Sequence, residues 1–143
     1  MRLAIVCSLT FFLEAGEIKR KLEEKGHSVS LPYSVERLLK GELKIEKINK
    51  MKQDGSFNKY VRSNDLIRRN WIRMKNDDAI LVINLEKKGI KGYVGGNTFL
   101  EMGLAFVNHM KIFLWDPIPN MEYSDEIHSM DPVVINGNID QVM

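Results

Sequence analysis

A glycine pair, a threonine and a glutamate lie within seven residues of one another and could together bind and cleave a small ligand. Gly95 and Gly96 are followed by Asn97, Thr98 and, three residues later, Glu101. Successive glycines let a ligand approach the main chain closely. Where a helix begins, its first amides have no partner within the helix, and its dipole favours negative charge. The segment therefore predicts a site for a phosphate or a developing oxyanion, with the Glu101 carboxylate beside it.

The same residues also fit a purely structural role. Thr98-Phe99-Leu100-Glu101 matches a capping box, in which a glutamate binds the main-chain amide of a threonine three residues before it. A plain cap does not require a preceding glycine pair. Spacing alone leaves both interpretations open.

Apolar runs predict the strands that must position these residues. The expected strands span residues 3–7, 27–31, 79–84, 111–115 and 133–135. The expected helices span residues 11–25, one or two stretches within 34–53, a single longer segment over 57–75, and residues 98–109 and 125–130. Buried strands alternating with amphipathic helices imply a parallel sheet with right-handed crossovers. The predicted fold class is α/β, a flavodoxin-like three-layer sandwich with a five-stranded parallel sheet, formed by residues 1–143 as a single domain.

In an open parallel sheet, ligands bind beyond the carboxyl ends of the strands. Ser8 and Thr10 follow the first strand and could donate hydrogen bonds to a phosphate or a sugar, or could instead cap the next helix. Phe11 could stack on a base. The residues that this rule adds to the glycine segment are Ser8, Thr10, Phe11, Asn84 and Asp116.

Two charged groups are expected to be structural. Asp77 and Asp78 precede a strand, which places them on the opposite rim of the sheet. Arg68, Arg69 and Arg73 are expected to form a solvated helix face.

Composition limits the partners of the chain. The formal net charge is +2 and Lys alternates with Glu, so no basic block predicts nucleic-acid binding. The one cysteine, Cys7, offers no intramolecular disulfide and no multi-cysteine metal site. No stretch approaches the roughly 20 apolar residues that span a bilayer. We expect a cytoplasmic protein without metal, cofactor or membrane contact.

Two segments carry a resemblance to a known enzyme family. Residues 78–83 read Asp-Ala-Ile-Leu-Val-Ile, and residues 95–105 read Gly-Gly-Asn-Thr-Phe-Leu-Glu-Met-Gly-Leu-Ala. An aspartate that opens a strand, followed by a Gly-Thr-x-x-Glu-x-Gly-x-Ala segment, resembles the nucleoside 2-deoxyribosyltransferase family. That superfamily includes the deoxynucleoside 5′-monophosphate N-glycosidases. The resemblance covers the chain in outline and is specific from Asp78 to Trp115.

The resemblance implies that Glu101 is the nucleophile that attacks C1′ of the sugar and displaces the base. A fixed carboxylate stabilises the oxocarbenium-like transition state or forms a covalent intermediate. Water then completes hydrolysis, or a second base accepts the sugar. The family forms homo-oligomers with shared sites, so a homodimer or higher homo-oligomer is expected.

Three positions depart from the family pattern. Asn97 stands where many members have glycine, residues 5–12 lack the usual tyrosine and Gly-Pro turn, and Asn84 replaces an aspartate. The acid that protonates the leaving base is therefore not evident from the sequence. The candidates on the expected edge are Asp116, Glu86 and Tyr93.

The leading hypothesis is an N-glycosidase that cleaves, or transfers, the base of a nucleoside or nucleoside 5′-monophosphate through Glu101. Hydrolysis is favoured over transfer because the missing family groups are those that manage the base. The alternative is a non-catalytic nucleotide-binding or sensing module in which Gly95 and Gly96 hold the ligand and Glu101 only caps. A third hypothesis is a structural homo-oligomer subunit without a small ligand.

Overall fold

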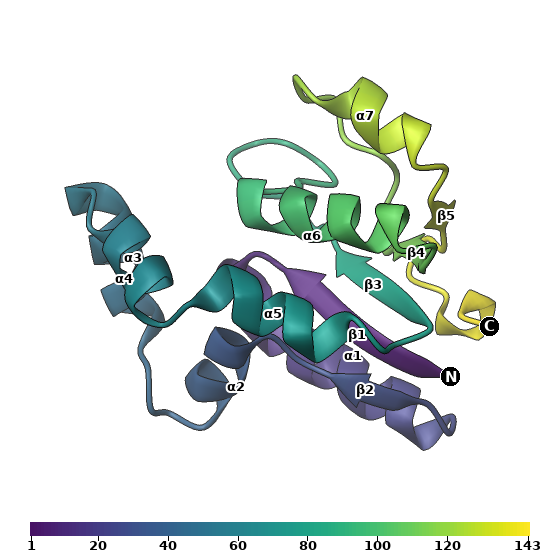
Figure 1. Cartoon of the computed structure of the whole chain (residues 1–143), viewed down its shortest axis with the longest axis horizontal. Coiled ribbons are helices and arrows are strands. Elements are labelled where there is room, and N and C mark those ends of the chain that lie inside the picture. Colours follow the sequence, from purple (N-terminus) through teal and green to yellow (C-terminus); the bar gives the residue numbers. More distant parts are fainter.

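A five-stranded parallel sheet lies at the centre of the molecule (Figure 1). The computed structural model describes residues 1–143. The strands are β1 (Arg2–Cys7), β2 (Ser28–Ser30), β3 (Ala79–Ile83), β4 (Lys111–Leu114) and β5 (Val133–Val134). They run in the order β2-β1-β3-β4-β5, and all four pairings are parallel. This is the flavodoxin-like order, so the predicted fold class is confirmed.

Helices cover both faces of the sheet, which gives three layers. The helices are α1 (Phe12–Glu24), α2 (Tyr33–Leu39), α3 (Ile45–Asp54), α4 (Phe57–Ser63), α5 (Leu66–Met74), α6 (Gly96–Val107) and α7 (Ser124–Ser129), with 3-10 turns η1 at Leu9–Phe11 and η2 at Ile139–Gln141. In Figure 1, α3 and α4 stand as a pair beyond the arrowheads of β1 and β3. None of the helices combines the length and the apolar character that crossing a bilayer would require.

Alternate residues of the central strands enter two separate hydrophobic cores. In β1, Leu3 and Ile5 pack in the core that includes the buried face of α1. Ala4 and Val6 pack in the core that holds residues of α5, α6 and α7, among them Met102. Successive side chains of a strand point to opposite faces, so a strand covered on both sides must be apolar throughout. This is why the apolar runs identified the strands correctly.

The segment expected to form one helix over 57–75 forms two. Helix α4 ends at Ser63, α5 begins at Leu66, and Asp65 between them has a φ of +49°, in the left-handed region. Aspartate and asparagine visit this region more readily than other side chains. The side-chain amide of Asn64 donates to the Tyr60 carbonyl at 2.9 Å and so satisfies one acceptor at the end of α4. The chain therefore turns at Asp65, and α5 returns to the sheet.

Helix α6 begins earlier than expected, which removes the predicted capping box. Its first residue is Gly96 and its N-cap is Gly95, with no side-chain hydrogen bond at the cap. Thr98 already lies inside the helix, and Glu101 lies in the second turn. A capping box requires the threonine to be the cap residue itself. The interpretation of Glu101 as a cap is therefore wrong.

The loop between β3 and α6 is held by one buried amide. Asn84, at the end of β3, donates from Nδ2 to the carbonyl oxygens of Asp116 (2.9 Å), Gly92 (3.3 Å) and Pro117 (3.3 Å), and its Oδ1 accepts the Asp116 amide at 2.9 Å. Gly92 has a φ of +72°, and a Cβ there would overlap the Pro117 carbonyl oxygen. The loop is thus fixed at Gly92, three residues before the N-cap Gly95.

Replacing Gly92 by alanine is expected to lower the free energy of unfolding by about 2 to 4 kcal/mol, through the left-handed φ and the steric overlap together. Gly89→Ala is the matched control, because Gly89 has a φ of +73° and open space around its Cα. The control is expected to lose only about 1 to 2 kcal/mol. Urea unfolding followed by circular dichroism measures both, and equal losses in the two variants would argue against close packing at Gly92.

Candidate functional site

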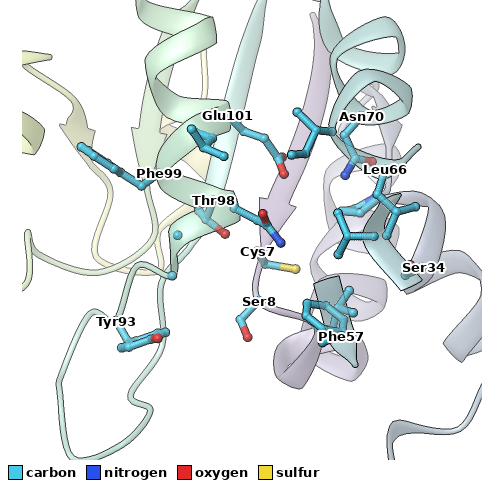
Figure 2. A pocket seen from close by; sticks show the side chains of 18 of the residues that line it. Cys7, Ser8, Ser34, Phe57, Leu66, Asn70, Tyr93, Thr98, Phe99 and Glu101 are labelled. Atoms are coloured by element: carbon cyan, nitrogen blue, oxygen red, sulfur yellow. The ribbon is translucent and has the colours of Figure 1, made fainter. Parts of the chain in front are cut away.

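A cavity of about 550 Å³ opens beyond the carboxyl end of β1, between α5 and α6 (Figure 2). Its walls come from the end of β1, from α4 and α5, from the start of α6, and from Lys52 of α3. The strand order reverses direction at β1 and β3, the position where open α/β sheets usually bind ligands. The volume lies within the range of small-molecule sites. This is the candidate functional site.

Glu101 projects from the second turn of α6 into this cavity (Figure 2). Its Oε2 atom is buried and has no hydrogen-bond partner. Burial raises the pKa of the Glu101 carboxyl to about 7, and the positive charge of Arg73 opposes part of that rise. The group therefore changes charge close to neutral pH, which is typical of carboxyls that act as acids, bases or nucleophiles.

Asn70 of α5 lies across the cavity from Glu101, and the Glu101 carboxylate points toward α5 (Figure 2). The Oδ1 atom of Asn70 is also buried without a partner. Buried polar groups are almost always hydrogen-bonded. Two such groups on facing helices fit a polar ligand held between them. The sequence analysis did not identify Asn70, although asparagine inside a helix otherwise rich in arginine and apolar residues is a poor helix former and could have drawn notice.

Arg73 is partly buried against β1 and the end of β2 and does not lie on a solvated helix face, so that expectation is wrong. Its guanidinium donates to the Ile5 carbonyl (3.0 Å), to the Ser30 carbonyl (3.1 Å) and to the Ser30 hydroxyl (3.0 Å). Burial lowers the pKa of Arg73, while the negative charges of Glu101 and Asp77 raise it. Arg68 and Arg69 are exposed as expected.

The Ile5 carbonyl is free to bind Arg73 because of a proline. In a parallel pair, every second amide of one strand bonds a carbonyl of its neighbour, as Ser28 does with Met1 (3.1 Å). Continued in register from the pairing of Ala4 with Ser30, this pattern would direct the amide of position 32 to the Ile5 carbonyl. Pro32 has no N–H to donate. The Arg73 guanidinium takes the place of the missing amide.

Cys7 lies between Glu101 and the cavity mouth (Figure 2). Burial, followed by the negative charge of Glu101, raises the pKa of the Cys7 thiol to about 12. Only the thiolate is a strong nucleophile or metal ligand. The cavity therefore presents Cys7 as a neutral thiol. No group of three or more His, Cys, Asp or Glu side chains is placed to hold a metal ion in the structure.

The cavity brings together the glycine segment and part of the first loop. The predicted site residues that line it are Ser8, Gly95, Gly96, Asn97, Thr98 and Glu101. Tyr93, one of the candidate acids, also lines it. Two lysines that the sequence analysis did not identify, Lys52 and Lys87, lie at its mouth.

The other predicted contacts lie outside this cavity. Thr10 is exposed on η1, and Phe11 is buried in the core beneath α1, because the 3-10 turn directs these neighbours to opposite sides. Asn84 is occupied by the loop hydrogen bonds described above. Asp116 and Glu86 line a second, separate depression. The predicted ligand contacts at Thr10, Phe11, Asn84 and Asp116 are therefore not part of this cavity.

The aspartate pair lies on the opposite rim, as expected. Asp78 accepts a hydrogen bond from the Arg2 amide at 2.7 Å, at the amino end of β1. Asp77 follows the end of α5 by three residues and is absent from the cavity lining.

Replacing Glu101 by glutamine is expected to stabilise the protein at pH 8 and to change its stability little at pH 5. Between the ordinary pKa of 4.5 and the raised value of about 7, the folded protein binds a proton that the unfolded chain lacks, so stability falls as the pH rises through this window. A shift of this size is worth at most about 3 kcal/mol. Urea unfolding at both pH values measures the difference.

The matched control is Glu126→Gln, at an exposed position of α7, where no such pH-dependent gain is expected. If Glu101→Gln changed the free energy of unfolding equally at pH 5 and pH 8, the ionised Glu101 carboxylate would not be destabilised by burial.

Comparisons of the chain with protein-family models, with curated proteins and with solved structures found no match. The resemblance of residues 78–105 to the nucleoside 2-deoxyribosyltransferases therefore remains an expectation from the sequence.

Proposed function

We propose that the chain hydrolyses the N-glycosidic bond of a nucleoside or nucleoside 5′-monophosphate, with Glu101 as the nucleophile. The observation that carries the proposal is the buried Glu101 carboxyl, which has an unpartnered oxygen and opens onto a cavity of ligand size. A carboxyl held only for stability would be paired or would face water. The proposal agrees with the role that the family resemblance implies for Glu101.

In the proposed reaction, the ionised Glu101 attacks C1′ of the sugar. The bond between C1′ and the base nitrogen breaks as a bond between C1′ and a Glu101 oxygen forms, and the base leaves with the bonding electron pair and takes up a proton from water. Water then attacks C1′, releases the free sugar and restores the carboxylate. A carboxyl with a pKa of about 7 is a stronger nucleophile, once ionised, than an ordinary glutamate.

Four other side chains would assist this reaction. Asn70 would hydrogen-bond the sugar or base opposite Glu101, because its side-chain amide lines the cavity across from that carboxyl. Arg73 would keep a fraction of Glu101 ionised, since its charge lowers the pKa of that carboxyl. The ring of Phe57 and the side chain of Leu66 would provide an apolar surface for the base.

A second candidate is a nucleotide-binding module without turnover. The observation that favours it is the amide of Asn70, which faces Glu101 but has no ionisable proton to give to a leaving base. In this case the cavity would hold the nucleotide intact. The assay below separates the two candidates.

Incubation with a panel of nucleosides and nucleoside 5′-monophosphates is expected to release free base, which chromatography detects. Glu101→Gln is expected to reduce kcat/KM by about a thousandfold or more, because the amide cannot form the glycosyl intermediate. Glu86→Gln is the control, since Glu86 lies in the separate depression and is expected to leave the rate unchanged. Ligand-induced thermal stabilisation without base release would instead support the binding module.

The rate of base release at low substrate is expected to rise about tenfold per pH unit below pH 7 and to level off above it, because only ionised Glu101 attacks. The raised pKa of about 7 places the bend well above that of an ordinary glutamate. Initial rates from pH 5 to 8.5 give the profile. A bend near pH 4.5, or a flat profile, would remove Glu101 as the titrating nucleophile.

A further inference from the structure

Side chains from three separate elements meet at the mouth of the cavity. Lys52 extends from α3, Lys87 from the loop after β3, and Ser8 from the end of β1. The Lys87 ammonium donates to the Ser8 hydroxyl at 2.8 Å. Neither lysine forms an ion pair, since no carboxylate oxygen lies within 4.0 Å of its ammonium group.

The two lysines are close enough to perturb one another. Burial, followed by the positive charge of Lys52, lowers the pKa of Lys87 to about 8. Burial also lowers the pKa of Lys52. Two like charges in a partly buried site repel, and no negative group of the protein offsets them. An anion at this point would relieve that repulsion.

Aromatic rings hold the lysines without neutralising them. The Lys52 ammonium lies 5.0 Å from the centroid of the Phe57 ring, and the Lys87 ammonium lies 5.4 Å from that of Tyr93. A cation over a ring face is attracted by the ring quadrupole, but the net charge stays positive. The lysines are thus positioned at the cavity while remaining available to an anion.

The start of α6 contributes a second anion-binding group to the same cavity. Gly95 and Gly96 line it, and the helix has no acidic residue in its first turn. Free amides at a helix start bind phosphate groups, and the helix dipole favours negative charge there. The lysine pair and the start of α6 therefore both favour a bound anion.

We propose that Lys52, Lys87, Ser8 and the first amides of α6 form a subsite for a phosphomonoester group carried by the substrate. This inference rests on the function proposed above and narrows it, because a nucleoside 5′-monophosphate would then be preferred to a free nucleoside. The phosphate would bind at the mouth, and Glu101 would face the sugar deeper in the cavity.

Calorimetric titration with ribose 5-phosphate, ribose and inorganic phosphate tests the subsite apart from catalysis. Ribose 5-phosphate is expected to bind, and Lys52→Gln and Lys87→Gln are each expected to weaken that binding about tenfold or more, the usual size for a charged hydrogen bond. Lys87→Arg is expected to retain it. Lys91→Gln is the matched control and is expected to bind ribose 5-phosphate normally, because Lys91 is exposed in the same loop but lines the separate depression.

The subsite is overturned if ribose binds as tightly as ribose 5-phosphate, or if the Lys52 and Lys87 variants bind ribose 5-phosphate as the unmodified protein does. Binding of inorganic phosphate without any binding of ribose 5-phosphate would also overturn the subsite, because the anion bound there would then not be part of the substrate.

Base release separates this inference from the proposed function. If the protein is a glycosidase with this subsite, kcat/KM for a nucleoside 5′-monophosphate exceeds that for the nucleoside about tenfold or more, and Lys87→Gln removes the preference. Equal cleavage of both compounds would overturn the subsite and leave the glycosidase intact. Lysine-dependent binding of ribose 5-phosphate without any base release would support the subsite and overturn the glycosidase.

Discussion

The Oε2 atom of Glu101 is buried but accepts no hydrogen bond. Burial raises the pKa of this carboxyl, and only the positive charge of Arg73 opposes that rise. An acid in such a position favours its neutral form and lowers the stability of the protein once ionised. The structure around it leaves space beside this group instead of filling it. The early start of α6 at Gly96, the turn at Asp65 and the loop clamp at Asn84 each help to define that space.

The sheet was predictable because its requirements are strict. A strand buried on both faces must be apolar at every position, as Ala79–Ile83 is, and right-handed crossovers leave few arrangements of such strands. Helix ends were less predictable. Apolar residues continue at helical spacing across Asp65, so the pattern gave no sign of the break. Thr98 and Glu101 have capping-box spacing although the helix had already begun at Gly96.

The site was predictable where its residues are neighbours in sequence and unpredictable where they depend on packing. The segment from Gly95 to Glu101 was identified because glycines, a helix start and a carboxylate occur together. Asn70 lines the cavity, and Arg73 affects the pKa of Glu101, only because of how α5 is rotated as it packs beside β1. Periodicity cannot determine that rotation to within one residue. Lys87 enters through a loop whose path depends on the Asn84 clamp.

The proline at position 32 has an effect well beyond its own turn. Had β2 carried an amide there, the ladder with β1 could have extended and occupied the carbonyl of Ile5. The guanidinium of Arg73, whose charge lowers the pKa of Glu101, would then have lost one of its three acceptors. The length of an edge strand thus affects the electrostatic potential inside the cavity, and an uncharged residue helps to determine the acidity of Glu101.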